Sequence, residues 1–393
     1  MIFVYFVFII FQFVLSSVVS VLTPWWRAGY TFEESQFAVH FARWIGVHAN
    51  FDGVHYMKIS SDGYALYQQA FFPLYPTLMH VVNLLTKIGP FFAGLIISLV
   101  SFWVMVFVWD KVFRQVADVQ LRFGRYQVSR ALLLLLISPC AFFFTTIYTE
   151  SLFMALLGAY VYAILNKKYF FAAVIGYFLG LTRFAGFFVF LIPLVIAIYD
   201  YLKTKHVSPR SLLPIISPGL GLVTYMLYLW YTIGQPLEFI YAQRGFGNSR
   251  STSIILLPQV LYRYIKILLL SKVDFGYFVA MFELGMFLLV FATLAIFLYR
   301  LLVSVRKSKP FFQNIDRNGV VMVALATFSF ANLILPSLSG TLGSIPRYVL
   351  ASIAFPLLIS KTWSSKLRWA YVGISILLHI ASALSFYLGY FVS

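Results

Sequence analysis

Apolar runs long enough to cross a lipid bilayer recur from one end of this 393-residue chain to the other. A helix needs about 20 apolar residues to span the roughly 30 Å of hydrocarbon in a membrane. Only 10% of the residues are charged and 62% are hydrophobic, which leaves too little polar surface for a soluble protein. The sequence therefore predicts an all-α polytopic membrane protein.

Run length and the positions of helix breakers predict about 11 transmembrane helices in a single domain, residues 1–393. The expected crossings are 2–22, 90–110, 131–147, 151–166, 169–183, 186–200, 212–233, 275–300, 319–336, 346–360 and 369–391. The stretch Phe71 to Leu85 has Pro73 and Pro76 at its start and is about fifteen residues long, so we expect a re-entrant or interfacial helix. A second outer amphipathic helix is expected at Ile254 to Leu270.

The formal net charge of +17 comes from lysines and arginines that occupy short loops between the apolar runs. They do not form one basic stripe with interleaved aromatic residues, so nucleic acid is not an expected partner. Cytoplasmic loops of membrane proteins are enriched in Lys and Arg, and this rule places the N-terminus inside. Two large loops, 23–89 and 234–274, then face the non-cytosolic side of a bacterial plasma membrane or endoplasmic reticulum. Function is expected on that side.

The run Asn50-Phe51-Asp52-Gly53-Val54-His55-Tyr56 places ionisable groups beside an apolar span. Such groups are costly near hydrocarbon and typically mark a site. Asp52 is the catalytic candidate, because a carboxylate at the membrane surface can take a proton from an attacking hydroxyl. His55 is a candidate donor to a phosphate or sugar oxygen. The alternatives are a solvated loop acid and a structural histidine.

Further candidates lie in the expected outer turns. Glu150 follows Tyr148 at the outer end of a helix, where an acid also suits the helix dipole and Thr149 suits the N-cap. Arg183 and Arg347, the latter followed by Tyr348, would bind phosphate oxygens or simply extend to the interface. Gln243 and Arg244 would contact a sugar or phosphate, or serve only as loop residues.

The chain has no nucleotide-phosphate cradle, such as a Walker loop or a glycine fingerprint. A transferase on the outer face would therefore need a donor that is already in the membrane. The only cysteine, Cys140, excludes an intrachain disulfide and a cysteine-zinc site. No cofactor is established by the sequence, and a divalent metal stays open because Asp52 and Glu150 would supply two carboxylates if they converge.

These motifs resemble the PIG-V-like mannosyltransferases, which add the second mannose to the glycosylphosphatidylinositol precursor and have bacterial relatives. The matching pieces are Asp52 to Tyr56, Gly63-Tyr64, Ala70 to Pro76, Tyr148 to Phe153, Leu181 to Gly186, Gly234 to Leu237, Gln243-Arg244 and Ser344 to Tyr348. The resemblance implies a GT-C glycosyltransferase bundle, a polyprenyl-phosphate sugar donor and Asp52 as base. It also implies substrate-binding roles for His55, Tyr56, Tyr64, Tyr148, Glu150, Arg183, Gln243, Arg244, Arg347 and Tyr348. The family usually has Trp where this chain has Phe51.

The function expected from the residues and the resemblance together is transfer of mannose, or a similar hexose, to a glycan or glycolipid hydroxyl with inversion. Membrane lipids are further expected partners of the protein. Two alternatives from other classes remain. A transporter or flippase for a lipid-linked sugar would use the same basic and aromatic lining without a base, and an assembly partner would keep the fold without catalysis.

Overall fold

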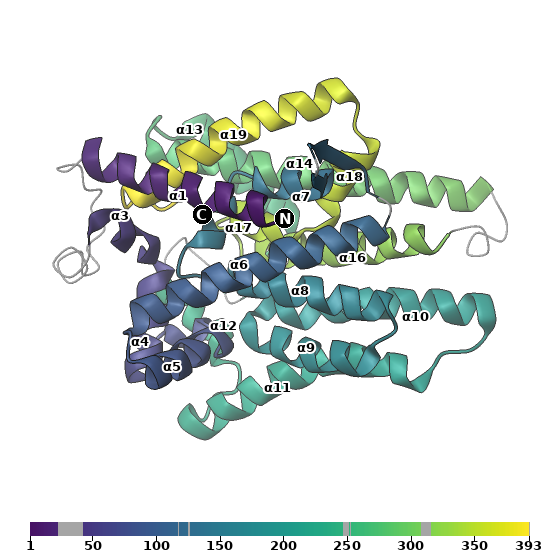
Figure 1. The fold of residues 1–393 in the computed structure, drawn as a ribbon, viewed down its shortest axis with the longest axis horizontal. Helices are drawn as coiled ribbons and strands as arrows, with labels where there is room; N and C mark the ends of the chain where they lie inside the picture. The colour runs from purple at the N-terminus through teal and green to yellow at the C-terminus, as the bar shows by residue number, and fades with distance from the viewer. Residues whose placement is uncertain are drawn as a thin grey trace.

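The computed structural model describes residues 1–22, 42–116, 118–124, 126–246, 251, 253–307 and 316–392. Residues 23–41 of the expected outer loop 23–89, and 247–250 and 252 of loop 234–274, lie outside the described residues. Most of the helices run along the long axis of the molecule (Figure 1). In the described residues the only sheet is a two-stranded hairpin. The prediction of an all-α polytopic fold is confirmed.

The N-terminal half carries a long first helix, a group of short helices and then three longer ones. Its elements are α1 (Ile2–Leu22), α3 (Arg43–Gly46), η1 (Val47–Ala49), α4 (Asp52–Asp62), η2 (Gln68–Ala70), α5 (Leu74–Thr86), α6 (Pro90–Gln115), β1 (Gln120–Phe123), β2 (Tyr126–Ser129), α7 (Arg130–Leu136), η3 (Ala141–Thr145), α8 (Glu150–Leu165) and α9 (Tyr169–Thr182). Helix α5 falls where an interfacial or re-entrant helix was expected.

The C-terminal half is built mainly from long apolar helices joined by short 3₁₀ turns. Its elements are η4 (Phe184–Phe190), α10 (Leu191–Thr204), η5 (Pro209–Leu212), α11 (Leu213–Ile233), α12 (Glu238–Tyr241), η6 (Ala242–Phe246), α13 (Leu257–Leu270), α14 (Phe275–Lys307), α16 (Arg317–Ser337), α17 (Ile345–Tyr348), η7 (Val349–Ala351), α18 (Ala354–Thr362) and α19 (Ser365–Tyr387). Helix α13 falls within the expected amphipathic segment 254–270.

Seven helical segments of the described chain are long and apolar enough to cross a membrane. They are α1, α6, η4 with α10, η5 with α11, α14, α16 and α19. Helices α8 and α9 are apolar but shorter.

Two of the expected crossings, 131–147 and 346–360, are not continuous helices. The first is interrupted after α7, where Pro139 cannot donate a backbone hydrogen bond. The second consists of α17 and α18 separated by the 3₁₀ turn η7. Crossing by these two segments stays a prediction.

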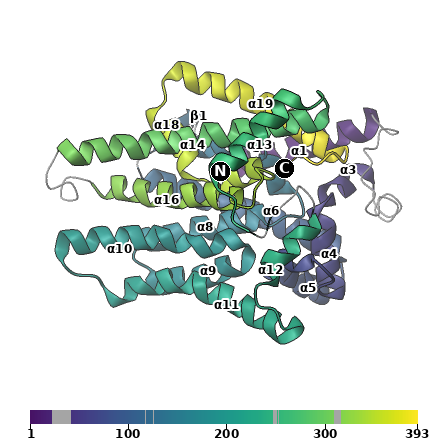
Figure 2. The same cartoon turned by 180° about the vertical axis from the view of Figure 1, so that it is seen from behind.

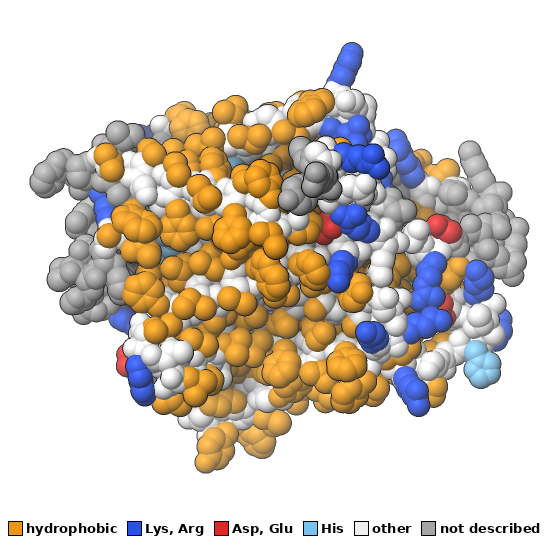
Figure 3. Space-filling view, in the orientation of Figure 1, with side chains coloured by type: hydrophobic (Ala, Val, Ile, Leu, Met, Phe, Trp, Pro, Cys, Tyr) orange, Lys and Arg blue, Asp and Glu red, His pale blue; other side chains and the backbone are white. Residues whose placement is uncertain are grey.

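The two ends of the bundle differ in charge. Figure 3 shows a broad hydrophobic band across the middle and Lys and Arg side chains gathered toward the right-hand end. In Figures 1 and 2, α3, α4, α5 and α12 lie at the opposite end. Basic residues in or beside the turns after α8, α10 and α18, such as Lys168, Lys205 and Lys366, therefore lie far from the short helices that carry the Asp52 motif, as the expected topology requires.

Helices α9 and α11 pack closely because small residues line their contact. A Cβ atom at Gly180 would collide with the backbone carbonyl oxygen of Pro218, and one at Gly221 would collide with that of Tyr177. Gly176 adds a third close approach, against the Ser217 hydroxyl. Small residues four apart let two membrane helices bring their backbones together. This contact fixes the C-terminal end of α9, after which Arg183 follows.

Two buried carboxylates tie the hairpin to the bundle. Asp118 accepts hydrogen bonds from the Ser129 hydroxyl and the Ala131 amide (2.5 and 2.9 Å), and from the Ser360 hydroxyl on α18. Asp110 on α6 accepts from the Ser129 amide at 2.9 Å and pairs with Arg114 at 2.7 Å. Because these oxygens have protein partners, we interpret the two acids as structural.

We expect Gly180→Val to destabilise the protein by about 1–3 kcal/mol, because the added side chain forces α9 away from α11. The measurement is the thermal unfolding midpoint in detergent micelles. Gly373→Val is the matched control, since nothing lies within 4 Å of a Cβ at that exposed position of α19. Equal midpoints for the two variants would contradict the close packing of α9 and α11.

Candidate active site

Four charged side chains from distant parts of the sequence meet in one cluster. Asp52 Oδ2 lies 2.6 Å from Arg347 Nη1, and Glu150 Oε1 lies 3.1 Å from Arg183 Nη1. The Nε atom of Arg347 lies 3.4 Å from Glu150 Oε1, which joins the two pairs. Asp52 and Glu150 are the first residues of α4 and α8, where the helix dipole favours a carboxylate. We call these four residues the ion cluster.

The four side chains of the ion cluster differ in solvent exposure. The side chains of Glu150 and Arg347 are 2% and 8% exposed, whereas those of Arg183 and Asp52 are 16% and 21% exposed. Asp52 is therefore the member most open to an incoming molecule. Burial opposes the charge on Arg347, but the carboxylates of Asp52 and Glu150 outweigh it and hold the pKa of the guanidinium well above its usual value.

Aromatic rings frame the two arginines. The Arg347 guanidinium carbon lies 5.4 Å from the ring centre of Tyr148 and 5.5 Å from that of Phe143. The ring of Tyr348 lies 5.3 Å from the guanidinium carbon of Arg183 and 5.8 Å from that of Arg347. Cation–π contacts of this kind hold a guanidinium in place without consuming its N–H donors. Tyr148 and Tyr348 thus pack against the ion cluster, and substrate-binding roles for them stay predictions.

The segments 48–52 and 145–148 are joined by a short series of hydrogen bonds, which we call the clasp. His48 Nδ1 lies 3.1 Å from the Thr145 carbonyl oxygen, and the Ile147 amide donates to the His48 carbonyl at 2.9 Å. The Tyr148 hydroxyl donates to the Asn50 carbonyl at 2.9 Å and accepts from the Asp52 amide at 3.1 Å. The clasp fixes the starts of α4 and α8 relative to each other, and hence Asp52 relative to Glu150.

The backbone just before Asp52 is strained. Phe51 has φ 58° and ψ −113°, a conformation that residues with a side chain rarely adopt. Its ring packs against Phe386 and Phe391, at ring-centre distances of 5.6 and 5.4 Å. The Asn50 side-chain Nδ2 also donates to the Phe386 carbonyl at 2.9 Å. The end of α19 therefore helps to hold the turn that aims Asp52.

The space around Gly53, the residue directly after Asp52, favours a glycine. A Cβ at this position would lie 3.3 Å from the Ile147 carbonyl oxygen and 3.5 Å from Cβ of Ala49. Both contacts are with the clasp or its neighbours. A larger residue would push α4 away from the segment that precedes Glu150.

His55 and Tyr56 lie one turn after Asp52 on α4. The His55 ring stacks on Phe71 with ring centres 5.1 Å apart, and its Nδ1 lies 3.5 Å from Gln68 Nε2. Burial, and to a smaller extent Lys58, lowers the pKa of His55, although the charge of Asp52 opposes this. Burial and then the charges of Asp52 and Glu150 raise the pKa of Tyr56. His55 is thus neutral at pH 7, and Tyr56 keeps its proton.

Three predicted residues are not joined to the ion cluster by the structure. The Tyr64 hydroxyl donates to the Phe71 carbonyl at 2.7 Å, within an aromatic group that includes Tyr225. Gln243 and Arg244 lie in η6, which packs against η2. The Arg244 guanidinium carbon lies 5.5 Å from the Tyr241 ring centre. Substrate-binding roles for these three residues stay predictions.

Two carboxylate oxygens of the ion cluster already have cationic partners, because Asp52 Oδ2 and Glu150 Oε1 each face a guanidinium. Glu150 Oε2, by contrast, is buried without a hydrogen-bond partner among the described residues. Within the residues that the structure describes, no three His, Cys, Asp or Glu side chains converge to hold a metal. A role for a divalent metal stays a prediction.

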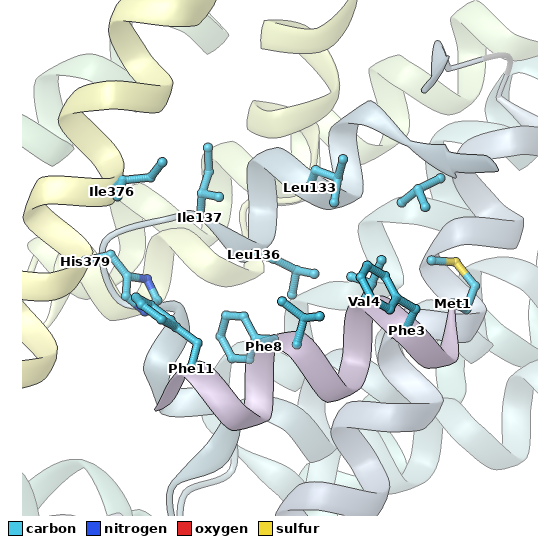
Figure 4. Close-up of a pocket in the computed structure, with 12 residues that line it drawn as sticks. Met1, Phe3, Val4, Phe8, Phe11, Leu133, Leu136, Ile137, Ile376 and His379 are labelled. Carbon is cyan, nitrogen blue, oxygen red and sulfur yellow. The ribbon is translucent and has the colours of Figure 1, made fainter. Parts of the chain in front are cut away.

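A separate cavity of about 290 Å³ lies between α1, α7 and α19 (Figure 4). Its lining is apolar apart from His379, and it includes none of the four ion-cluster residues. The nitrogens of His379 are both engaged, Nδ1 with the Ser138 carbonyl at 2.9 Å and Nε2 with Gln12 Nε2 at 2.8 Å. The cavity therefore has apolar walls and no chemistry of its own.

Two asparagines that sequence reasoning left without a role position parts of the site. Asn50 anchors the turn before Asp52, as described above. Asn332 on α16 donates to the Tyr348 carbonyl at 2.8 Å and so holds α17, which carries Arg347. The available signal for Asn332 was an amide side chain inside an apolar span, where a polar group needs a partner.

We expect the clasp to make stability depend on pH. Burial lowers the pKa of His48 to about 4, against 6.5 when exposed, although its bond to Thr145 opposes the shift. As the pH falls, the unfolded chain therefore binds a proton at a higher pH than the folded protein does. The free energy of unfolding decreases by about 2 kcal/mol between pH 7.5 and 5. In thermal unfolding at these two pH values, His48→Gln should lose less stability than the unmodified protein.

The control for this measurement is His206→Gln, which changes an exposed histidine at the end of the bundle opposite the clasp. It should keep the pH dependence of the unmodified protein. An unchanged pH dependence in His48→Gln would contradict the assignment of a neutral, buried imidazole to the clasp.

The family model described as mannosyltransferase (PIG-V) matches residues 2–311 of the chain. The match includes Asp52, Glu150 and Arg183, and Arg347 lies beyond it. Comparisons with curated proteins and with solved structures gave no significant match. The match extends over far more than half of the sequence and includes three of the four ion-cluster residues. The chain therefore belongs to the mannosyltransferase (PIG-V) family and is a membrane-bound glycosyltransferase.

Proposed function

We propose that this enzyme moves mannose from a polyprenyl-phosphate carrier to a hydroxyl of a glycan or glycolipid, on the non-cytosolic face of its membrane. The observation that carries the proposal is the contact of 2.6 Å between Asp52 and Arg347. It places a candidate base beside a cation able to receive a phosphate leaving group. These are the two groups that displacement at a sugar phosphate requires.

The donor is proposed from the chemistry of the two arginines. A guanidinium presents parallel N–H donors that match phosphate oxygens, and in a poorly solvated site these bonds are strong. Arg183 and Arg347 already hold anionic oxygens, those of Glu150 and Asp52. The chain has no glycine-rich nucleotide cradle, which favours a lipid phosphate over a nucleotide sugar.

The reaction is a single in-line displacement. The acceptor hydroxyl oxygen attacks the anomeric carbon, and the bond from that carbon to the phosphate oxygen breaks with its electron pair on the phosphate. The hydroxyl proton passes to Asp52. Arg183 and Arg347 stabilise the charge that develops on the leaving phosphate. One displacement inverts the anomeric configuration and needs no covalent sugar–enzyme intermediate.

The charges of the ion cluster link donor binding to release of the base. Two arginines and two carboxylates cancel formally, so a phosphate must compete with Asp52 for Arg347. When Arg347 turns to the phosphate, the Asp52 carboxylate is released from its nearest cation and can contact the acceptor hydroxyl. The more buried Glu150 retains the arginines near the site. The donor is accordingly expected to bind before the acceptor.

Residues around the cluster take supporting roles in this proposal. His55, neutral at pH 7, offers an imidazole N–H to a sugar or phosphate oxygen one helical turn from Asp52. Tyr148 fixes the Asp52 backbone and supports Arg347 with its ring. The proposed face follows from topology, because the Asp52 motif lies at the end of the bundle opposite the basic turns, and those turns are expected to be cytoplasmic (Figures 1 and 3).

The test of the base is Asp52→Asn in purified protein in lipid nanodiscs. The assay follows labelled mannose from polyprenyl-phosphate-mannose to extracted host glycolipids. We expect a loss of turnover of about 100-fold or more, with folding retained. Asp62→Asn, at the exposed far end of α4, is the matched control and should keep full turnover. Equal turnover in Asp52→Asn and the unmodified enzyme would remove Asp52 from the mechanism and favour a transport role.

The test of phosphate binding is Arg347→Lys. An ammonium keeps the charge but cannot present two parallel donors, so we expect the KM for the donor to rise about tenfold. Arg300→Lys, on the exposed part of α14, is the control and should leave this KM unchanged. An unaltered donor KM in Arg347→Lys would show that the donor phosphate binds elsewhere.

A further inference from the structure

A buried acid outside the ion cluster has no part in the mechanism above. Glu283 is 5% exposed and lies in α14, one of the long apolar helices. A carboxylate inside a membrane span is costly and is typically retained for a function. The hydrogen-bond partner of Glu283 indicates what that function is.

Glu283 holds the hydroxyl of Tyr264. Tyr264 lies on α13, and its Oη donates to Glu283 Oε2 at 2.6 Å. The same oxygen accepts from the Leu342 amide at 3.0 Å and lies 3.1 Å from the Thr341 hydroxyl. A hydrogen bond to a carboxylate is stronger than one to a neutral group, and it orients the phenol so that its lone pairs face residues 341 and 342.

The segment that Tyr264 holds leads directly into α17. The Leu342 carbonyl accepts from the Ile345 amide at 3.0 Å, which forms the start of this short helix. Ser344, with φ 67°, then accepts at its carbonyl from the Arg347 amide at 3.1 Å. Leu342 thus bonds to Tyr264 through its amide and to the start of α17 through its carbonyl.

Further hydrogen bonds join residues 338–340 to α13 and to the chain just before it. The Arg263 side chain donates to the Gly340 carbonyl at 3.1 Å. The Ile255 amide donates to the Leu338 carbonyl at 2.9 Å, and the Ser251 amide donates to the Ser339 carbonyl at 2.8 Å. Residues 338–342 are therefore fixed from the α13 side along their whole length, with Tyr264 bonding nearest to Arg347.

We propose that Tyr264 and Glu283 are positioning residues that set the place of Arg347 and thereby the affinity for the donor phosphate. The inference rests on the proposed function, because it takes Arg347 to bind that phosphate. The role proposed for Glu283 is to accept the hydrogen bond of the Tyr264 hydroxyl. Both residues act through residues 341 and 342 and lie outside the ion cluster, so their loss should weaken donor binding more than it slows the chemical step.

The experiment measures donor KM, kcat and thermal unfolding for Tyr264→Phe, Glu283→Ala and Glu283→Gln in nanodiscs. Tyr264→Phe and Glu283→Ala should raise donor KM about five- to tenfold and leave kcat within about twofold, as expected for loss of one or two hydrogen bonds. Glu283→Gln keeps an oxygen acceptor and should stay close to the unmodified enzyme. Tyr262→Phe, on the 66% exposed side chain of the same helix, is the control.

Two results would overturn the inference. One is an unchanged donor KM in folded Tyr264→Phe while Arg347→Lys raises it. The other is a Glu283→Gln variant as impaired as Glu283→Ala, which would show that the carboxylate itself is required. If Tyr264→Phe does not fold, Thr341→Val replaces it, since it removes a single bond to Tyr264 and should raise donor KM about twofold. An unaffected Arg347→Lys would instead contradict the proposed function.

Discussion

Arg347 lies almost completely buried between two carboxylates, and much of the surrounding structure holds this arrangement in place. Burial of an ion pair costs desolvation energy that is recovered only when the geometry is good. The clasp sets the distance between Asp52 and Glu150, rings of Tyr148 and Tyr348 support the guanidinium, and Asn332 holds α17 from α16. The surrounding elements thus meet a geometric requirement that the four charges impose.

The same requirement explains why the site is divided between rigid and strained parts. Helices α9 and α11 meet through glycines and leave Arg183 little freedom of position. Phe51, by contrast, has an unfavourable backbone conformation that is maintained by the clasp and the end of α19. Strain of this kind persists only where the surroundings over-determine it, and it occurs here beside the most exposed charge of the cluster.

The sequence allowed the all-helical membrane fold to be predicted, and it singled out all four residues of the ion cluster as candidates. Run length is a strong signal in membranes, and Asp52, Glu150, Arg183 and Arg347 are polar residues in expected outer turns. It did not reveal that each acid would face an arginine, because contacts between residues so far apart depend on packing. The breaks within 131–147 and 346–360 were missed because average hydropathy hides a local proline, Pro139, and a short 3₁₀ turn, η7. Glu283 gave a signal, an acid in an apolar run, but its partner Tyr264 had none.

The order of the cluster residues along the chain has a consequence for how the protein is made. Asp52 is synthesised first and Arg347 last, with most of the helical bundle between them. Glu150 can find Arg183 as soon as α8 and α9 have inserted, whereas Asp52 must wait for α17 to leave the ribosome. Until then the Asp52 carboxylate lacks its Arg347 partner. The ion cluster can therefore be completed only after residue 347 has been synthesised, long after its other three members.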